Sequence, residues 1–376
     1  MTFKLIHTAD WQIGKRFGSF PGDKPAVLRE ERLRVVGRLA EAAQANGATT
    51  ILVAGDVFDS ETVSDEVCRQ LLARLKAYPQ LDWHLLPGNH DPARAGSVWE
   101  AVTAVGVPPN VHVHLRPEPA ELAPGVMLFP APLTAKSTSR DPTQWMDDAA
   151  TPAGTIRIGL AHGSVQGFGS EGDAEVPIDP ARPKSARLAY LALGDWHGTT
   201  RISDRVWYSG TPETDSFPDN EPGFALAVEI AGADAVPKVS RVATSHYTWV
   251  RRQERIASAN DLGALEADIA KLGSDATRHL MTLQLTGDVA LAELSAIEER
   301  LGALKPQLFH LEADLSGLHA HAGTSDMEVL GGGALASVAE RLKAKAEGAG
   351  EDAAVAELAL RKLFALARRV DAGGRA

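Results

Sequence analysis

The sequence has little cysteine, no long apolar run and no excess of positive charge, and each absence excludes a class of protein. Its single cysteine, Cys68, excludes an internal disulfide bond and favours a reducing compartment. The first residues show no apolar segment of the signal-peptide type, and no stretch approaches the roughly 18 apolar residues that cross a bilayer. We therefore expect a cytoplasmic protein with no membrane partner.

The net charge of −11 excludes a wide basic surface of the kind that coats nucleic acid, although it leaves room for a local basic groove. No two cysteines stand at metal-ligand spacing, so a structural zinc site is excluded as well. The length of 376 residues favours two or three domains.

What the first half contains is one repeated pattern, in which a short apolar run ends in a polar cluster. Each run is typical of a buried strand, and the runs cover 3–6, 50–54, 83–86, 156–161 and 188–193. Helical spacing of apolar residues predicts helices over 25–46, with Gly47 as C-cap, and over 64–77. This alternation of strand and helix predicts a largely parallel sheet.

Near residue 245 the pattern changes to that of a small α/β accessory domain. Its expected strands are 247–256, 279–285 and 307–315, and its expected helices are 261–272 and 291–304. Loop composition follows at 317–326, and then two Ala/Leu/Glu/Lys/Arg-rich helical stretches reach the end. We predict three parts, residues 1–244, 245–318 and 319–376, the last being a linker and C-terminal helices.

The polar clusters carry the residues that suit metal chemistry. They are Asp10-Trp-Gln12, Gly55-Asp56-Val-Phe-Asp59, Gly88-Asn89-His90-Asp91, His162-Gly163 and Gly194-Asp195-Trp-His197. If the five strands are neighbours in one sheet, the clusters meet at its carboxyl edge, where open α/β sheets bind ligands. The mixture of carboxylate, amide and imidazole suits Mn²⁺, Fe²⁺ or Zn²⁺ better than Ca²⁺. The glycines before Asp56, Asn89 and Asp195 allow sharp turns and leave room beside a metal.

The order of these five motifs resembles that of the calcineurin-like metallophosphoesterases. The opening His7-Thr-Ala-Asp-Trp and the segment Tyr208-Ser-Gly-Thr-Pro-Glu213 resemble the SbcD/Mre-type DNA-repair exonucleases, and the likeness covers roughly residues 5 to 220. It implies an α/β fold with a four-layer α-β-β-α sandwich, residues 1–244 being the nuclease domain. The small α/β accessory (capping) domain and the C-terminal helices would follow it.

The resemblance also implies a centre with two divalent metal ions, in which Asp56 bridges both. The ligands it implies for the first ion are Asp10, Gln12 and His197. The ligands it implies for the second ion are Asn89, His162 and Asp195. Mn²⁺ is the expected metal, with Fe²⁺, Mg²⁺ or Zn²⁺ as alternatives.

In the same resemblance His90 is the catalytic group that protonates the leaving oxygen or stabilises the phosphate, and Asp91 orients it. Gln12 and Asp195 depart from the pattern, since most relatives have histidine at both positions. Gln12 is a weaker ligand than imidazole, so we expect unequal metal affinities. Either residue can instead hold a water molecule or His197 without touching a metal.

The function expected from this resemblance is a metal-dependent DNA exonuclease of the SbcD type that acts in DNA repair, with 3′–5′ polarity taken from the family. One alternative is a small-molecule phosphoesterase on the same core. Another is a weakly catalytic scaffold subunit of an ATPase complex. Metal content and DNA cleavage would discriminate among them, because the fold alone does not.

DNA, an SMC-like ATPase of the SbcC type and a second copy of this chain are the expected partners. Lys15 and Arg16 are candidates for binding a DNA phosphate, with a solvated charged loop as the alternative. Trp11 and Trp196 are interpreted as walls of the metal pocket, base stacking being the alternative. The tail helix over 352–370 has an apolar stripe that fits a partner's coiled coil or internal packing: Val355, Ala359, Leu363, Leu366 and Val370.

Overall fold

The computed structural model describes residues 2–168, 175–217, 219–321, 333–346, 348 and 350–373. Its contacts divide the chain into two compact units, Met1–His246 and Tyr247–Ala376. The further division of the second unit at residue 318 stays a prediction.

The first unit contains two six-stranded sheets. The first has the order β14-β13-β1-β2-β3-β4, with β1 Phe3–Thr8, β2 Thr50–Val53, β3 Asp82–Leu85, β4 Val111–Val113, β13 Phe224–Ile230 and β14 Lys238–Ala243. The second has the order β11-β12-β10-β7-β6-β5, with β5 Ala120–Ala123, β6 Val126–Ala131, β7 Ile156–His162, β10 Tyr190–Gly194, β11 Thr200–Arg201 and β12 Val206–Tyr208. The central pairs are parallel in both sheets, as the strand–helix alternation predicts.

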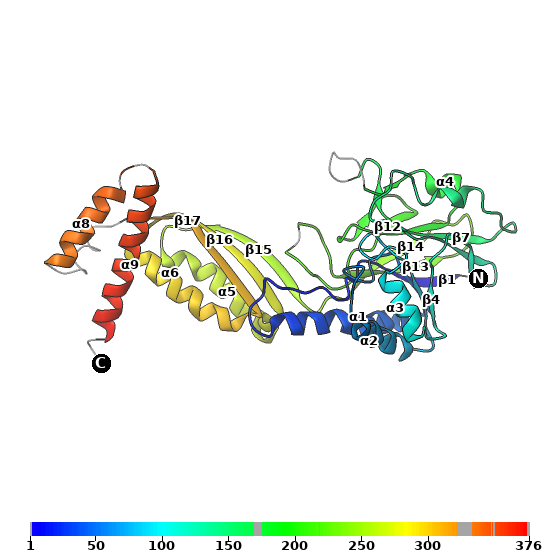
Figure 1. The fold of residues 1–376 in the computed structure, drawn as a ribbon, viewed down its shortest axis with the longest axis horizontal. Helices are drawn as coiled ribbons and strands as arrows, with labels where there is room; N and C mark the ends of the chain where they lie inside the picture. Colours follow the sequence, from blue (N-terminus) through cyan, green and yellow to red (C-terminus); the bar gives the residue numbers. More distant parts are fainter. Residues whose placement is uncertain are drawn as a thin grey trace. The chain divides into compact units, whose positions relative to one another are not determined.

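Three apolar layers hold these sheets between helices. Leu5 and Leu52 of the first sheet meet Ile158 and Leu160 of the second in the middle layer. The outer face of the first sheet is covered by α1 (Lys24–Asn46), α2 (Asp65–Lys76) and α3 (Val98–Val105), which Figure 1 shows beside β1 and β4. The outer face of the second sheet packs against η1 (Gln144–Asp147) and the pair β8 (Ser164–Val165) and β9 (Pro177–Ile178). The short α4 (Arg182–Ser185) is joined to η1 by the ion pair between Arg182 and Asp147. This is the predicted α-β-β-α sandwich.

The first helix illustrates how the sequence sets its own boundaries. Leu28, Val35, Leu39 and Ala43 recur at helical spacing and are all buried against the first sheet or its surroundings. Gly47 ends the helix with φ +64°, a left-handed conformation that glycine adopts without a steric penalty. The predicted helix and its glycine cap are therefore confirmed.

The five motif strands do not share one sheet, which was the condition given above for their ends to meet. β1, β2 and β3 belong to the first sheet, whereas β7 and β10 belong to the second. The motifs still meet, because the two sheets are joined at the same edge: His162 Nδ1 lies 2.9 Å from the carbonyl oxygen of Ala54, and His7 Nδ1 lies 2.9 Å from the Tyr190 hydroxyl. Strands buried on both faces show the same continuous apolar run in either sheet, so periodicity does not separate the two sheets.

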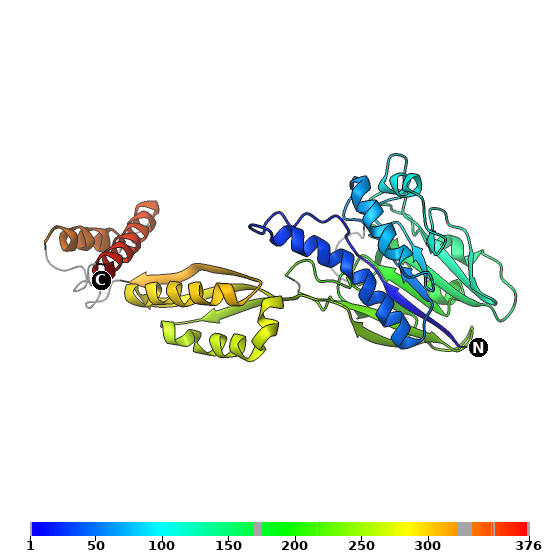
Figure 2. The same cartoon turned by 90° about the horizontal axis from the view of Figure 1, so that it is seen from below.

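The second unit has a parallel three-stranded sheet, β15-β16-β17, with one face covered by α5 (Gly263–Leu272) and α6 (Leu291–Leu304) (Figures 1 and 2). Its strands are β15 Thr248–Arg255, β16 His279–Ala290 and β17 His310–His321. The predicted loop at 317–326 is wrong for 317–321, because β17 stays paired with β16 as far as Ala290↔His321. Residues 322–326 lie outside the described residues.

Two helices follow, α8 (Ala334–Ala346) and α9 (Glu351–Gly373). Leu360 and Phe364 of α9 pack with Leu291 of α6, and Ala356 of α9 is buried as well. Most of the predicted apolar stripe lies beside this buried face: Val355 and Leu366 are 66% and 59% exposed, Leu363 packs at the edge of the cluster, and the side chain of Val370 lies outside the described residues. Alanine and leucine occur on several faces of this helix, so periodicity does not select the buried one.

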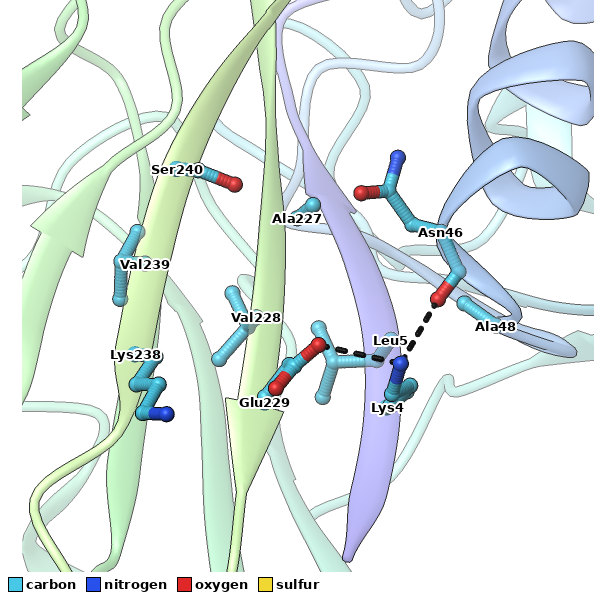
Figure 3. A pocket seen from close by; sticks show the side chains of 10 residues that line it. All are labelled: Lys4, Leu5, Asn46, Ala48, Ala227, Val228, Glu229, Lys238, Val239 and Ser240. Carbon is cyan, nitrogen blue, oxygen red and sulfur yellow. Dashed lines mark hydrogen bonds and ion pairs between the residues drawn. The ribbon is translucent and has the colours of Figure 1, made fainter.

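A pocket of about 260 Å³ opens at the start of β1, the opposite end of the strand from the first motif (Figure 3). Lys4 Nζ lies there 3.0 Å from Glu229 Oε1 and 3.3 Å from the carbonyl oxygen of Asn46. The pocket lining has one carboxylate, Glu229, which is paired with Lys4, and it has no imidazole, so the pocket is unsuited to the metal chemistry of the motifs. Among the described residues no helix is long and apolar enough to span a membrane.

We expect Leu160→Ala to destabilise the sandwich by about 2–5 kcal/mol, since Leu160 is fully buried between the two sheets and its loss leaves a cavity. Denaturant unfolding measures this. The control, Val236→Ala, removes a side chain that is 57% exposed and should change stability by less than about 0.5 kcal/mol. Equal losses in the two variants would contradict the layer assignment.

Candidate metal centre

Three buried side chains from both sheets come together at the shared carboxyl edge. Asp10 follows β1, Asp56 follows β2 and His162 ends β7, and one ligand atom of each lies within 4.8 Å of the others. All three residues are among the metal ligands that the family resemblance implies.

Asp56 is at the middle of this cluster. Its Oδ2 accepts a hydrogen bond from Gln12 Nε2 at 2.8 Å, and its Oδ1 accepts one from the backbone N–H of His90 at 2.9 Å. His162 Nε2 lies 3.5 Å from the same Oδ1. One carboxylate thus contacts residues of three other motifs, which is the position that a bridging ligand requires.

The ring of His162 is fixed from behind. Nδ1 lies 2.9 Å from the Ala54 carbonyl oxygen, which can only accept, so Nδ1 carries the proton and donates it. Nε2 faces the cluster, 3.1 Å from Asn89 Oδ1 and 3.8 Å from Asp195 Oδ1. A backbone carbonyl that holds the far nitrogen is the arrangement by which proteins orient metal-binding histidines.

The last motif closes the cluster. The backbone N–H of Asp195 lies 3.2 Å and 3.3 Å from the two carboxylate oxygens of Asp10, and Ser164 Oγ donates to Asp195 Oδ2 at 2.7 Å. Asp10 also acts electrostatically on His197, whose pKa it helps to raise against the lowering effect of burial. The structure therefore brings together the seven predicted ligands: Asp10, Gln12, Asp56, Asn89, His162, Asp195 and His197.

The backbone at this edge is adapted to the crowding. A Cβ on Gly55 would lie 2.2 Å from His162 Nδ1, one on Gly88 would lie 2.2 Å from Asp56 Oδ1, and one on Gly194 would lie 2.0 Å from the Ala54 oxygen. Four of the six non-glycine residues with positive φ among the described residues are predicted ligands: Asp10, Gln12, Asp56 and Asp195. Such strain is concentrated where a fold holds functional groups in place.

Burial and charge act against each other here. Burial raises the pKa of Asp10 to about 6, although His197 and His162 lower it. Burial alone would lower the pKa of His162, but the carboxylates of Asp56, Asp10 and Asp195 raise it to about 9. Buried carboxylates this close together require positive charge near them, because a carboxylate without a counter-charge is costly to bury.

The residues present fit a divalent metal ion. Gln12 Oε1 is buried and, among the described residues, has no hydrogen-bond partner, whereas the amide nitrogen of the same side chain is bound to Asp56. A buried carbonyl oxygen without a donor is an available ligand. Carboxylate, amide oxygen and imidazole together match Mn²⁺, Fe²⁺ or Zn²⁺.

The expected contact between Asp91 and His90 is wrong. Asp91 is fully buried, and its oxygens accept from the backbone N–H groups of Gly88 (2.6 Å) and Phe58 (3.0 Å). The partner of the His90 ring is the carbonyl oxygen of Asp59, 3.0 Å from Nδ1. Asp91 therefore fixes the two loops that carry Asp56 and Asn89, and the backbone of Asp59 orients His90.

Asp215 lies outside the five motifs, yet it contacts the site. It is buried, lies 3.5 Å from His197 Nδ1, and pairs with Lys15 Nζ at 2.7 Å. Burial would raise its pKa, but the hydrogen bond with His197 and the charges of Arg32 and Lys15 hold the pKa well below its usual range. Lys15, a predicted phosphate-binding residue, is therefore engaged with Asp215. Arg16 is exposed, and its role in binding DNA stays a prediction.

Arg32 of α1 is a second residue that the sequence did not indicate. Its guanidinium is buried and donates to the carbonyl oxygens of Trp11 (2.7 Å), Glu213 (2.9 Å) and Asp10 (3.2 Å). It joins the first motif to the loop that carries Asp215. Polar residues are frequent on the exposed face of α1, so no sequence signal separates this one from its neighbours. His7 has a structural role, since its ring bonds to the Tyr190 hydroxyl and to the Leu193 carbonyl oxygen.

The calcineurin-like phosphoesterase family model matches residues 3–228, which include every motif described above. Two curated relatives are named as subunits of the nuclease SbcCD. The protein from Rhodobacter capsulatus is 29% identical over 258 residues, 56% of this chain and 62% of its own length. The protein from Bacillus subtilis is 25% identical over 267 residues, 61% of this chain and 66% of its own length.

The chain thus spans less than two thirds of the length of either relative. Among solved structures, that of TT1561 from Thermus thermophilus aligns with 65% of this chain and 100% of its own, at 12% identity and a TM-score of 0.42. That score is too low to support a conclusion.

Gln12→Glu tests whether residue 12 contacts a metal. In chelator the new carboxylate loses the bond to Asp56 and adds a like charge, so stability should fall by about 1–3 kcal/mol. With saturating Mn²⁺ the melting temperature should rise more than in the wild type. Gln12→Leu, which has no ligand atom, should show a smaller rise. Equal metal-induced rises in all three proteins would remove residue 12 from the ligand set.

Asp215→Asn should weaken Mn²⁺ binding by roughly 10- to 100-fold, because the carboxylate that orients His197 is lost. Isothermal titration calorimetry measures the dissociation constant, and melting in chelator checks that the variant is folded. Asp141→Asn is the matched control, since it removes another carboxylate from an ion pair, that with Arg182. The same Mn²⁺ affinity in Asp215→Asn as in the wild type would show that Asp215 does not position His197.

Proposed function

The chain belongs to the calcineurin-like phosphoesterase family, and from this premise we propose that it is a metal-dependent DNA exonuclease of the SbcD type. The observation that carries the proposal is the buried cluster of Asp10, Asp56 and His162 from both sheets, which Gln12 and Asn89 contact directly. The two relatives named as nuclease subunits support DNA as the substrate. The phosphoester-hydrolysing core is common to the family, whereas DNA, repair and 3′–5′ polarity are part of the proposal.

Two divalent ions, with Mn²⁺ as our first choice, would supply a bound hydroxide and the charge that stabilises the phosphate in the transition state. Asp56 would hold both ions. Asp10, Gln12 and His197 would complete one site, and Asn89, His162 and Asp195 the other. The backbone amide of His90 and the amide nitrogen of Gln12 keep the Asp56 carboxylate in one orientation.

His90 is the residue we propose as general acid. Its side chain is 53% exposed, so a substrate can reach it. The Asp59 carbonyl oxygen accepts from Nδ1 and leaves Nε2, 4.0 Å from Asp56 Oδ2, as the ring atom that would hold the proton for the leaving oxygen. Exposure and a fixed ring together suit a group that must meet an incoming phosphodiester.

The C-terminal helices support a partner protein. Leu335 and Val338 of α8 and Val355, Leu358 and Leu366 of α9 are exposed, although both helices also contribute buried residues. Exposed apolar residues on helices are typical of helix-in-groove contacts. Together with the naming of both relatives as subunits, they support a coiled-coil segment of an SMC-like ATPase as the partner. A second copy of this chain is the further partner that we propose.

The test of the proposed reaction is degradation of linear duplex and single-stranded DNA with Mn²⁺. We expect the wild type to cleave and His90→Ala to lose about 10²- to 10⁴-fold of the rate while it keeps its metal ions. His112→Ala is the matched control, because His112 is half-exposed, pairs with Asp82 and lies outside the motifs.

Two outcomes would contradict this proposal in different ways. Hydrolysis of bis(p-nitrophenyl) phosphate without cleavage of any DNA would identify a small-molecule phosphoesterase. Full activity in His90→Ala would leave the nuclease intact and assign the proton transfer to another group.

A further inference from the structure

One aromatic ring at the metal edge is exposed. Trp196 stands between Asp195 and His197, two predicted ligands, and its side chain is 37% exposed. It is the only aromatic residue among the large apolar side chains that are exposed in the described part of the chain. The other candidate from the sequence, Trp11, is fully buried and donates its Nε1 hydrogen to Thr8 Oγ1 at 3.0 Å. Of these two tryptophans, Trp196 is therefore the one that can meet a ligand.

This ring is supported from within the protein. Phe168 meets it edge to face, with 5.4 Å between ring centroids and an interplanar angle of 78°. Phe168 in turn stacks on Tyr208 at 5.7 Å. Tyr208 is buried in β12, where its hydroxyl donates to the Gly163 carbonyl oxygen and accepts from the Val165 N–H, both at 2.8 Å. The three rings form a support anchored in the second sheet.

The backbone of the same loop is fixed on both sides of the ring. The Asp195 N–H donates to the Asp10 carboxylate, and the His197 carbonyl oxygen accepts from the Thr211 N–H at 3.0 Å. A tryptophan held at both neighbours and backed by Phe168 loses little conformational freedom when a flat ligand stacks on it. It is therefore a preorganised surface.

We infer that Trp196 is a stacking platform for an unpaired nucleobase of the strand whose phosphate lies at the metal cluster. This rests on the proposed function, since it takes the cluster as the phosphate site. The chemistry at this position favours a nucleobase. The exposed tryptophan ring suits a flat group, and the predicted metal ligands on either side of it suit a phosphate linked to that group. An extended apolar partner would need a continuous apolar patch, which the neighbours Asp195 and His197 interrupt.

The geometry also selects unpaired bases. In a duplex each internal base is covered on both faces by its neighbours, and only its edges are open in the grooves. A tryptophan face can therefore reach a base only at a single-stranded, frayed or terminal position. Stacking tolerates all four bases, so the platform would distinguish unpaired from paired bases without distinguishing one base sequence from another.

The test is a double-mutant cycle between the protein and the DNA. In the His90→Ala background with Mn²⁺, fluorescence anisotropy gives the dissociation constant of a labelled single-stranded oligonucleotide, and of the same oligonucleotide with abasic sites along its terminal residues. Proteins with Trp196 should bind the base-containing strand roughly 5- to 100-fold more tightly than the abasic strand. Trp196→Ala should remove that difference, and Trp196→Phe should restore part of it. Val236→Ala, which removes another exposed apolar side chain, should keep it in full.

Failure of this inference is distinct from failure of the proposed function. If the wild type degrades DNA and Trp196→Ala shows the same preference for bases as its parent, the platform is wrong and the nuclease stands. If no DNA is cleaved but the cycle shows the expected loss, the platform stands and the proposed reaction falls. Absence of oligonucleotide binding by every variant would overturn the platform, and a lower melting temperature of Trp196→Ala in chelator would show damage to the fold.

Discussion

The buried carboxylate of Asp56 is the group on which the rest of the catalytic edge depends. It receives hydrogen bonds from Gln12 and from the backbone of His90, and it lies beside His162 of the opposite sheet. Its neighbour Asp10 is buried as well. Two buried carboxylates are costly without a nearby positive charge, so the stability of this edge depends on one. A divalent cation would satisfy that need, and it would also stabilise the charge that develops when a phosphoester is hydrolysed.

Much of the fold follows from local patterns in the sequence. The apolar runs predicted β1, β2, β3, β7 and β10, and the capping glycine of α1 and the periodicity of α6 predicted those helices closely. The assignment of strands to two sheets did not follow from these patterns. A strand buried on both faces is a continuous apolar run in either sheet, so its sequence does not identify the strands beside it. The end of β17 was missed for a related reason: pairing with β16 holds Gly317 in a strand although its composition is typical of a loop.

The residues of the candidate site likewise fall into those that the sequence predicted and those that it missed. Residues in contiguous motifs, such as Asp56 and Asn89, were predicted from their type and order. Asp215 and Arg32 were missed because they act across the chain: one meets His197 and Lys15, and the other meets the carbonyl groups of two separate loops. The partner of the His90 ring is likewise a backbone carbonyl, which no side-chain pattern encodes.

The left-handed backbone at four predicted ligand positions has an evolutionary consequence. A β-branched or bulky residue is disfavoured at such positions, whereas short polar residues, aspartate above all, adopt this conformation readily. Asp195, at φ +103°, is a short polar residue of this kind, and its carboxylate offers an oxygen donor together with a negative charge. Natural selection can adjust which ion this edge prefers by single substitutions while the architecture is inherited unchanged.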